Sequence, residues 1–118
     1  MLKDKSTRNL AAGDALSTLG FTDAAASRYY YSLYQAAVHR LTQLGWTPGR
    51  LRSGAVRWDH VMVMHNMSLI RGRRSDRDLY EVMRDLRLKA DYADVSVELQ
   101  ALADCVAGTR EFVEEVTA

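Results

Sequence analysis

The fold of this chain is organised around the stretch Arg84-Asp85-Leu86-Arg87-Leu88-Lys89-Ala90-Asp91-Tyr92-Ala93-Asp94. Apolar residues in it and just before it recur at helical spacing, at Leu79, Met83, Leu86 and Ala90. This spacing predicts the end of an amphipathic helix with one face toward a core. Arg87 and Asp91 lie four residues apart on the next face. Tyr92 follows where the helix should stop.

Two interpretations of the Arg87–Asp91 pair stay open. A solvated ion pair at this spacing would stabilise the helix by only about 0.2–0.5 kcal/mol. The order is the less favourable one, because such a pair is stronger when the acid precedes the base. The pair is therefore also a candidate for a role in binding or in helix packing.

Composition predicts one all-α domain spanning residues 1–118. The chain has 118 residues, of which 47% are hydrophobic, so it can bury a single core. It has one proline and little strand-like alternation. No apolar run reaches the roughly 20 residues of a membrane span, and the polar N-terminus lacks a signal-peptide core. Cys105 is the single cysteine, so we expect a cytoplasmic protein without membrane association.

Charge is unevenly distributed along the sequence. Residues 40–89 contain eleven Lys or Arg and five Asp or Glu, whereas the remainder contains five and ten. A basic middle predicts a face that attracts phosphate, unless charges of both signs interleave in three dimensions. The densest basic segment is the turn Arg71-Gly72-Arg73-Arg74.

Five helical segments are expected, at about 4–18, 22–44, 55–70, 75–91 and a last one beginning near Asp94 or Ser96. Thr22 is the predicted N-cap of the second helix, and Gly45 lies where a C-terminal glycine belongs. Ser75 is the predicted cap of the fourth helix.

Aromatic residues surround much of the second helix. Tyr30 and Tyr34 belong to its apolar stripe, but Tyr29 and Tyr31 point to other faces. The helix thus carries more aromatic residues than one packing face requires. This predicts a helix contacted from two sides, by its own core and by a partner or ligand. We therefore expect a homodimer, since most homo-oligomers are two-fold symmetric.

Three motifs resemble those of a known family. The segment Arg28-Tyr29-Tyr30-Tyr31-Ser32-Leu33-Tyr34-Gln35-Ala36-Ala37 resembles the R-x-Y-Y-x-x-[FY]-x-A-A core of small prokaryotic HEPN-domain proteins. Arg87 to Tyr92 resembles the R-x-x-A-D-Y that follows in them. Between these, Ser53-Gly54-Ala55-Val56 resembles their H-S-G-[VI], with Arg52 where the family often has histidine. Order and spacing agree from about Phe21 to Val116.

The resemblance implies an up-and-down bundle of four to five helices that dimerises through its two long helices. HEPN domains occur in ribonucleases and in toxin–antitoxin systems, often beside a minimal nucleotidyltransferase. Others belong to CRISPR-associated or other defence systems, and some bind nucleotides without cleaving anything. The expected partners are therefore a second copy, RNA or a nucleotide, and a nucleotidyltransferase or another defence-system protein. No cofactor is expected.

The nuclease branch of the family carries R-x(4–6)-H. Arg87 matches its arginine, but positions 92–94 hold Tyr92, Ala93 and Asp94. Asp91 is a poor general base beside arginines, and an unperturbed tyrosine titrates near 10. The sequence therefore favours a binding module over an enzyme. The alternatives are a metal-independent ribonuclease with a degenerate site at Arg87, Asp91 and Tyr92, and a structural subunit of a larger CRISPR or phage-defence complex.

The candidate residues for RNA or nucleotide binding are Arg28, Tyr31, Arg84, Arg87, Arg71, Arg73 and Arg74. We expect a polar network between the second and fourth helices in which Asp91 holds Arg28 or Arg87. A buried pair that only fixes helix register is the alternative. His60 and His65 are five residues apart and do not share a helix face, so no metal site is expected.

Overall fold

The computed structural model describes residues 1–47, 49–50, 56–57 and 59–118. The predicted all-α class is confirmed, with five helices in the described residues. They are α1 (Leu2–Thr18), α2 (Thr22–Gln43), α3 (His60–Ile70), α4 (Arg74–Tyr92) and α5 (Leu99–Val116). A minimal antiparallel pair, β1 (Gly49–Arg50) with β2 (Val56–Arg57), lies between α2 and α3.

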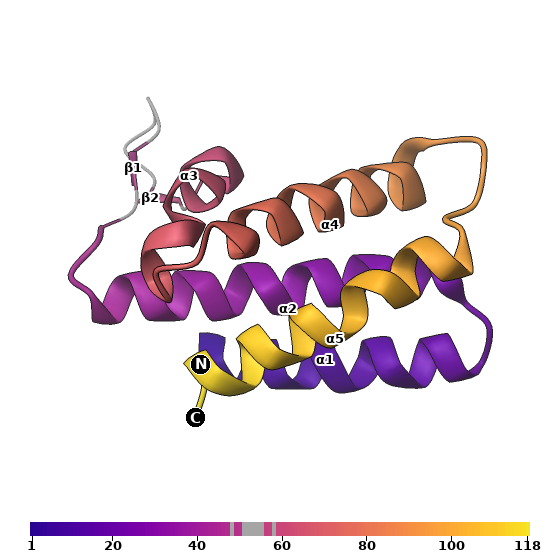
Figure 1. Ribbon diagram of the computed structural model, residues 1–118, viewed down its shortest axis with the longest axis horizontal. Coiled ribbons are helices and arrows are strands. Elements are labelled where there is room, and N and C mark those ends of the chain that lie inside the picture. The colour runs from indigo at the N-terminus through magenta and orange to yellow at the C-terminus, as the bar shows by residue number, and fades with distance from the viewer. Residues whose placement is uncertain (48, 51–55, 58) are drawn as a thin grey trace.

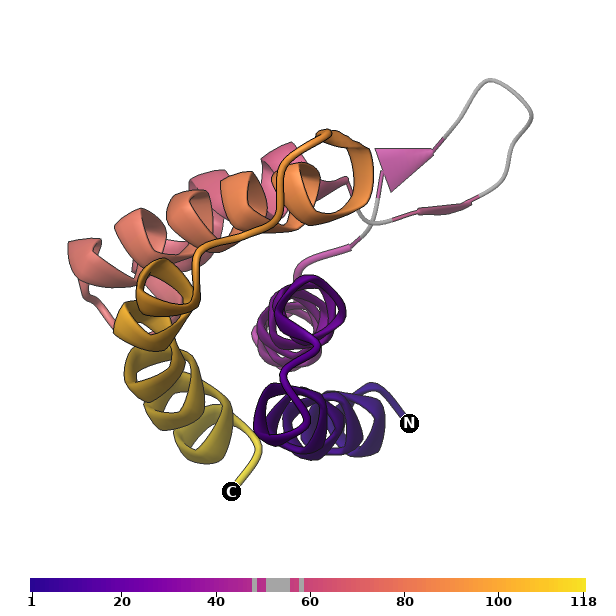
Figure 2. The same ribbon diagram turned by 90° about the vertical axis from the view of Figure 1, so that its right-hand side faces the viewer.

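The four long helices alternate in direction, and α2 lies at the centre of the bundle (Figure 1). It packs against every other helix. Viewed from the end, α3, α4 and α5 curve around α2 while α1 lies along its other side (Figure 2). The core is accordingly built on α2, whose buried apolar residues are Ala25, Ala26, Tyr29, Tyr30, Leu33, Ala36, Ala37, Val38 and Leu41.

Small residues let α1 approach α2 closely. Ser6 and Ser32 are buried, and each donates its hydroxyl to the backbone carbonyl of the other at 2.7 Å. Gly13 faces the ring of Tyr29, and a Cβ at this glycine would lie 2.8 Å from ring atoms. Tyr29 and Tyr30 are thus enclosed by the chain's own helices. Burial was expected for Tyr30, but the burial of Tyr29 removes that ring from the sequence argument for a second contact surface.

Three predicted helix starts are wrong. The third helix begins at His60, not at residue 55, because the Asp59 carboxylate caps it by accepting from the Val61 N–H at 2.7 Å. The fourth begins at Arg74, so Ser75 lies inside the helix and caps nothing. The last begins at Leu99 with Glu98 as its N-cap.

The late start of α5 has a tertiary cause. Asp23, in the first turn of α2, accepts a hydrogen bond from the backbone N–H of Val97 at 2.7 Å. This contact holds the α4–α5 connection in an extended path across the end of the bundle. The N-cap of α2 also differs from the prediction, being Phe21 rather than Thr22. Within the part of the chain that the structure describes, every helix is too short or too polar to cross a lipid bilayer.

Candidate nucleic-acid interface

Arg87 lies in the interface between α4 and α2. Its Nη2 donates to the Tyr31 hydroxyl at 2.8 Å, and its Nε lies 3.0 Å from Asp91 Oδ2. The other Asp91 oxygen accepts from the Ser27 hydroxyl at 2.7 Å. Two pairs with four-residue spacing, Ser27/Tyr31 and Arg87/Asp91, therefore face each other across antiparallel helices. Of the two arginines considered for this network, the structure places Arg87 in it.

Three tyrosine rings surround the Arg87 guanidinium. Its central carbon lies 5.7 Å from the ring centroid of Tyr30, 5.4 Å from that of Tyr31 and 5.8 Å from that of Tyr92. Such cation–π contacts contribute about 0.5–1 kcal/mol each at exposed sites. Burial acts to lower the pKa of Arg87, but the phenol oxygen of Tyr31 and the carboxylate of Asp91 outweigh it and raise that pKa. The guanidinium is thus a fixed cation.

The Arg87 site is not saturated with hydrogen bonds. The buried Nε–H of Arg87 has no hydrogen-bond acceptor among the described residues, so the contact with Asp91 is an ion pair without hydrogen-bond alignment. Asp91 is one-third exposed, and no second carboxylate pairs with Arg87 in the described part of the chain. A single, partly hydrated carboxylate balances this cation.

Tyr30 connects the Arg87 site to α3. Its hydroxyl is hydrogen-bonded to the Tyr80 hydroxyl at 2.9 Å and to Nδ1 of His60. The His60 ring stacks on Tyr34 with 4.4 Å between centroids. Burial raises the pKa of Tyr30 to about 12, against the lowering effects of the Tyr80 hydrogen bond and the Arg87 charge. Sequence reasoning missed this histidine, because no spacing along the chain links His60 to Arg87.

Two more predicted residues border the Arg87 site without joining its hydrogen bonds. Arg28 is exposed one turn before Tyr31, and its Nη1 donates to Asn9 Oδ1 at 3.4 Å. Arg84 lies one turn before Arg87 and lines a hollow of about 240 Å³ with Met64, Glu81 and Asp85. Neither arginine forms an ion pair with another described residue.

The basic turn predicted to bind nucleic acid is largely neutralised by carboxylates. Arg71 donates from Nε and Nη2 to the two oxygens of Asp76 at 2.9 and 2.7 Å. It also pairs with Glu111 at 3.2 Å and with Glu115, and it lies over the Phe112 ring. The hydrogen bonds to Asp76 raise the pKa of Arg71 despite its burial. Arg71 is thus a buried connection between the start of α4 and α5.

The other two arginines of the turn remain near the surface. Arg73 pairs with Glu111 at 2.8 Å, and both side chains are exposed. Arg74 is exposed and lines a hollow of about 410 Å³ with Arg77, Asp78 and Glu81. Phosphate binding by these arginines stays a prediction, with Arg74 the least engaged of the three.

Two further expectations concern the third family motif and a metal site. Arg52, Ser53, Gly54 and Ala55, which carry most of the third family motif, lie outside the described residues. Among the described residues, no three His, Cys, Asp or Glu side chains gather closely enough to hold a metal ion.

Comparison with protein-family models, with curated proteins and with solved structures finds no match to this chain. The HEPN resemblance therefore rests on its sequence motifs and stays a prediction.

Proposed function

We propose that this protein is a HEPN-type binding module that binds single-stranded RNA or a nucleotide through the Arg87 surface, defined as Arg28, Tyr31, Arg87 and Tyr92. The observation that carries the proposal is the position of Tyr92. The residue is 74% exposed, yet the fixed Arg87 guanidinium lies over one side of its ring, 5.8 Å from the ring centroid. An exposed aromatic ring held in place in this way is a stacking platform.

The chemistry of single-stranded nucleic acid fits this surface. Unpaired bases stack on aromatic side chains, and each such contact contributes about 1–3 kcal/mol to binding. Arg28 supplies positive charge for phosphates, because no described carboxylate pairs with it. Arg84 adds charge one turn from Arg87, although Glu81 and Asp85 line the same hollow. The surface has no glycine-rich phosphate loop, so recognition depends on tyrosine and arginine side chains.

The cellular setting of this binding rests on the family resemblance. It favours a homodimeric component of a toxin–antitoxin or other defence system, with a minimal nucleotidyltransferase as the expected partner. Because Tyr29 and Tyr30 are buried within the chain, the homodimer is proposed on the resemblance alone. Sedimentation at micromolar concentration tests it, and a clean monomer would remove this part of the proposal.

Binding is tested by fluorescence anisotropy with a labelled, adenine-rich single-stranded RNA. Tyr92→Ala is expected to weaken binding by about 1–3 kcal/mol, whereas Tyr92→Trp retains it because the stacking ring remains. Phe21→Ala, which removes another exposed aromatic ring, is the matched control and should leave affinity unchanged. Equal affinity of wild type and Tyr92→Ala would contradict the proposal.

A second candidate, a metal-independent ribonuclease, is favoured by one observation. The fold brings His60 to Tyr30, whose ring in turn contacts Arg87, so a histidine and an arginine flank the same tyrosine. Cleavage needs a base for the 2′-hydroxyl and positive charge at the phosphorus centre. The Tyr30 ring stands between the two groups, which argues against a shared substrate atom.

An RNA-cleavage assay in the presence of a metal chelator separates the two candidates. We expect no cleavage by the wild-type protein. Robust cleavage that is lost in both His60→Gln and Arg87→Lys, at unchanged melting temperature, would establish the ribonuclease instead.

A further inference from the structure

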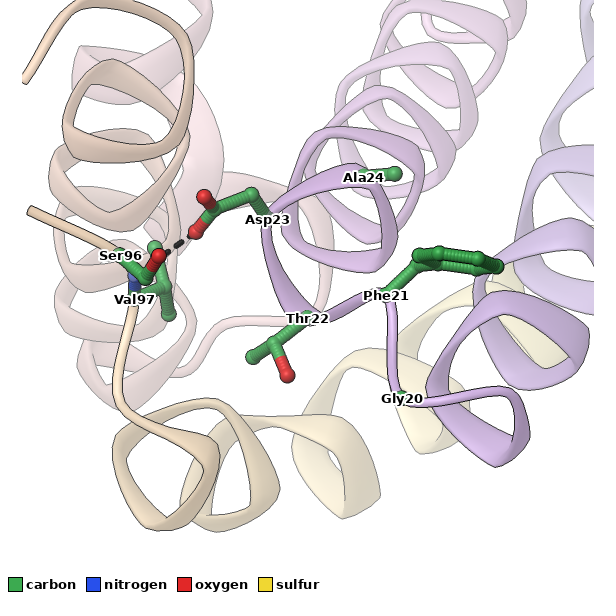
Figure 3. Close-up of a pocket in the computed structure, with 7 residues that line it drawn as sticks. All are labelled: Gly20, Phe21, Thr22, Asp23, Ala24, Ser96 and Val97. Atoms are coloured by element: carbon green, nitrogen blue, oxygen red, sulfur yellow. Dashed lines mark hydrogen bonds between the residues drawn. The ribbon is translucent and has the colours of Figure 1, made fainter.

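One end of the bundle is formed by two connections that lie far apart in the sequence. Residues 19–21 join α1 to α2, and residues 93–98 join α4 to α5. Both lie at the right-hand end of Figure 1 and face the viewer in Figure 2. The hydrogen bond from the Val97 N–H to Asp23 joins the second connection to the first turn of α2, which directly follows the first connection (Figure 3).

A hollow of about 460 Å³ opens between these connections. It is lined by Gly20, Phe21, Thr22, Asp23, Ala24, Ser96 and Val97. In Figure 3, Ser96 and Val97 face Asp23 on one side, whereas the Phe21 ring lies on the side away from Val97. The Val97 side chain is buried, so the hollow has an apolar wall as well as the polar groups of Thr22 and Ser96.

Large apolar side chains are exposed on both connections and at the start of α5. Leu19, Phe21, Val95 and Leu99 are each more than half exposed. We call these four residues, with the hollow, the apolar end. Single exposed hydrophobic residues need no explanation, but a group of them around a hollow is typical of an interaction surface.

Carboxylates outnumber basic residues around the apolar end. Residues 11–27 and 90–109 contain six Asp or Glu and no Lys, Arg or His. Arg110 engages Asp14, and Arg87 engages Asp91. Asp94 and Glu98 are exposed and form no ion pair with another described residue.

Backbone dipoles do not reverse this negative field. Two helices end here, α1 and α4, and two begin here, α2 and α5. The partial charges at helix starts and ends therefore largely offset one another, and the carboxylates decide the sign. Lys89, in the last turn of α4, offsets only one of them.

We propose that the apolar end is a docking surface for a basic polypeptide segment of a partner protein. An apolar side chain of that segment enters the hollow beside Phe21 and Val97, and its lysines or arginines pair with Asp94 and Glu98. Charge complementarity selects this occupant, because an acidic segment or a nucleic-acid backbone would be repelled. The apolar end adjoins the Arg87 surface at Tyr92, the last residue of α4, but its unpaired charges among the described residues are the carboxylates of Asp94 and Glu98.

The probe for this proposal is a fluorescein-labelled peptide in which a Leu–Phe pair is flanked by lysines. Two control peptides replace the Leu–Phe pair with serines or the lysines with glutamates. The full chain is expected to bind the first peptide and neither control. The double variant Phe21→Ser, Leu99→Ser should lose roughly tenfold or more in affinity, since two apolar contacts are removed.

Matched variants separate this surface from others on the same chain. Leu69→Ser, which changes an exposed apolar residue on α3, should leave peptide affinity unchanged. The pair Asp94→Asn, Glu98→Gln should weaken binding and flatten its salt dependence. Thermal melts establish that each variant is folded.

Several outcomes would overturn the proposal. They are the absence of peptide binding to wild type, equal affinity for the glutamate peptide, and unchanged affinity in the Phe21→Ser, Leu99→Ser variant. Loss of self-association in that variant, without peptide binding, would identify a second copy as the occupant instead. RNA affinity should not change in that variant, so failure here and failure of the RNA proposal are distinguishable.

Discussion

Two arginines of this chain, Arg71 and Arg87, lie in clusters of different chemistry. The Arg71 side chain is 7% exposed. It contacts three carboxylates, one from Asp76 beside it and two from α5, and one aromatic ring, that of Phe112. The Arg87 side chain is 18% exposed and is surrounded by three tyrosine rings with one carboxylate. Both were candidates for nucleic-acid binding on sequence grounds.

The difference shows what neighbours do to an arginine. Several carboxylates neutralise Arg71 and use its hydrogen-bond donors, so its contribution is to hold α4 against α5. Tyrosine rings fix the Arg87 guanidinium in place, and the one carboxylate that balances its charge, Asp91, is partly exposed. An arginine of the second kind can support a ligand, because it orders an aromatic ring, Tyr92, that stays exposed to one.

The largest effect is expected for Arg71→Ala. Removing the arginine leaves the Asp76 carboxylate, which is 4% exposed, without its partner. Breaking a buried pair in this way costs about 3–5 kcal/mol of unfolding free energy. Chemical denaturation measures the loss, and Arg73→Ala, whose pair with Glu111 is exposed, is the matched control at roughly 0–1 kcal/mol. A stable Arg71→Ala protein with reduced RNA affinity would reverse the roles assigned to the two clusters.

The folding stability that the buried tyrosines beside Arg87 contribute should be lost in alkali. Burial raises the pKa of Tyr30 to about 12, so the folded state holds this proton more tightly than the unfolded state, where tyrosine titrates near 10. The resulting stability is fully present below about pH 10 and is lost as pH rises through about 12. Melting temperature against pH, followed with phenolate absorbance, should show this loss in wild type and a weaker one in Tyr30→Phe. Identical alkaline profiles would contradict it.

Arg87→Ala should have a smaller effect on folding than Arg71→Ala. It removes the hydrogen bond to Tyr31 and the ring contacts, but Asp91 is partly exposed and becomes hydrated. We expect a loss of about 1–2 kcal/mol in unfolding free energy, together with weaker RNA binding. Arg87→Lys restores the charge without the planar contacts and should recover only part of the affinity. A loss as large as that of Arg71→Ala would indicate a purely structural role for Arg87.

The smallest effect is expected in acid, at the Arg71 cluster. Hydrogen bonds from Arg73 and Arg71 lower the pKa of Glu111 below its ordinary value of 4.5. The stability from this shift is present above pH 4.5 and is lost as pH falls through the lowered pKa. Glu111→Gln should therefore flatten the acid limb of the melting curve slightly and leave the alkaline limb unchanged. A change at the alkaline limb would show that the two clusters are coupled.

The sequence by itself predicted the helices and the local geometry of the Arg87–Asp91 pair. The stripe at Met83, Leu86 and Ala90 and the four-residue spacing of Arg87 and Asp91 follow from the 3.6-residue period of an α-helix, which every helical segment obeys whatever packs against it. The all-α class follows from the same property. Helix starts were predicted less well. The cap at Asp59 is one of several local alternatives, and the hydrogen bond between Val97 and Asp23 joins residues 74 apart in the sequence.

Only the tertiary structure decided which charges remain available. Arg71 meets Glu115 across a separation of 44 residues, and Tyr30 meets His60 across 30. These pairings depend on the rotation and axial position of each helix against α2, which the close packing of buried side chains sets. Local spacing carries no information about that packing. The sequence therefore identified the arginines, and the packing of the core decided that carboxylates enclose Arg71 while tyrosines enclose Arg87.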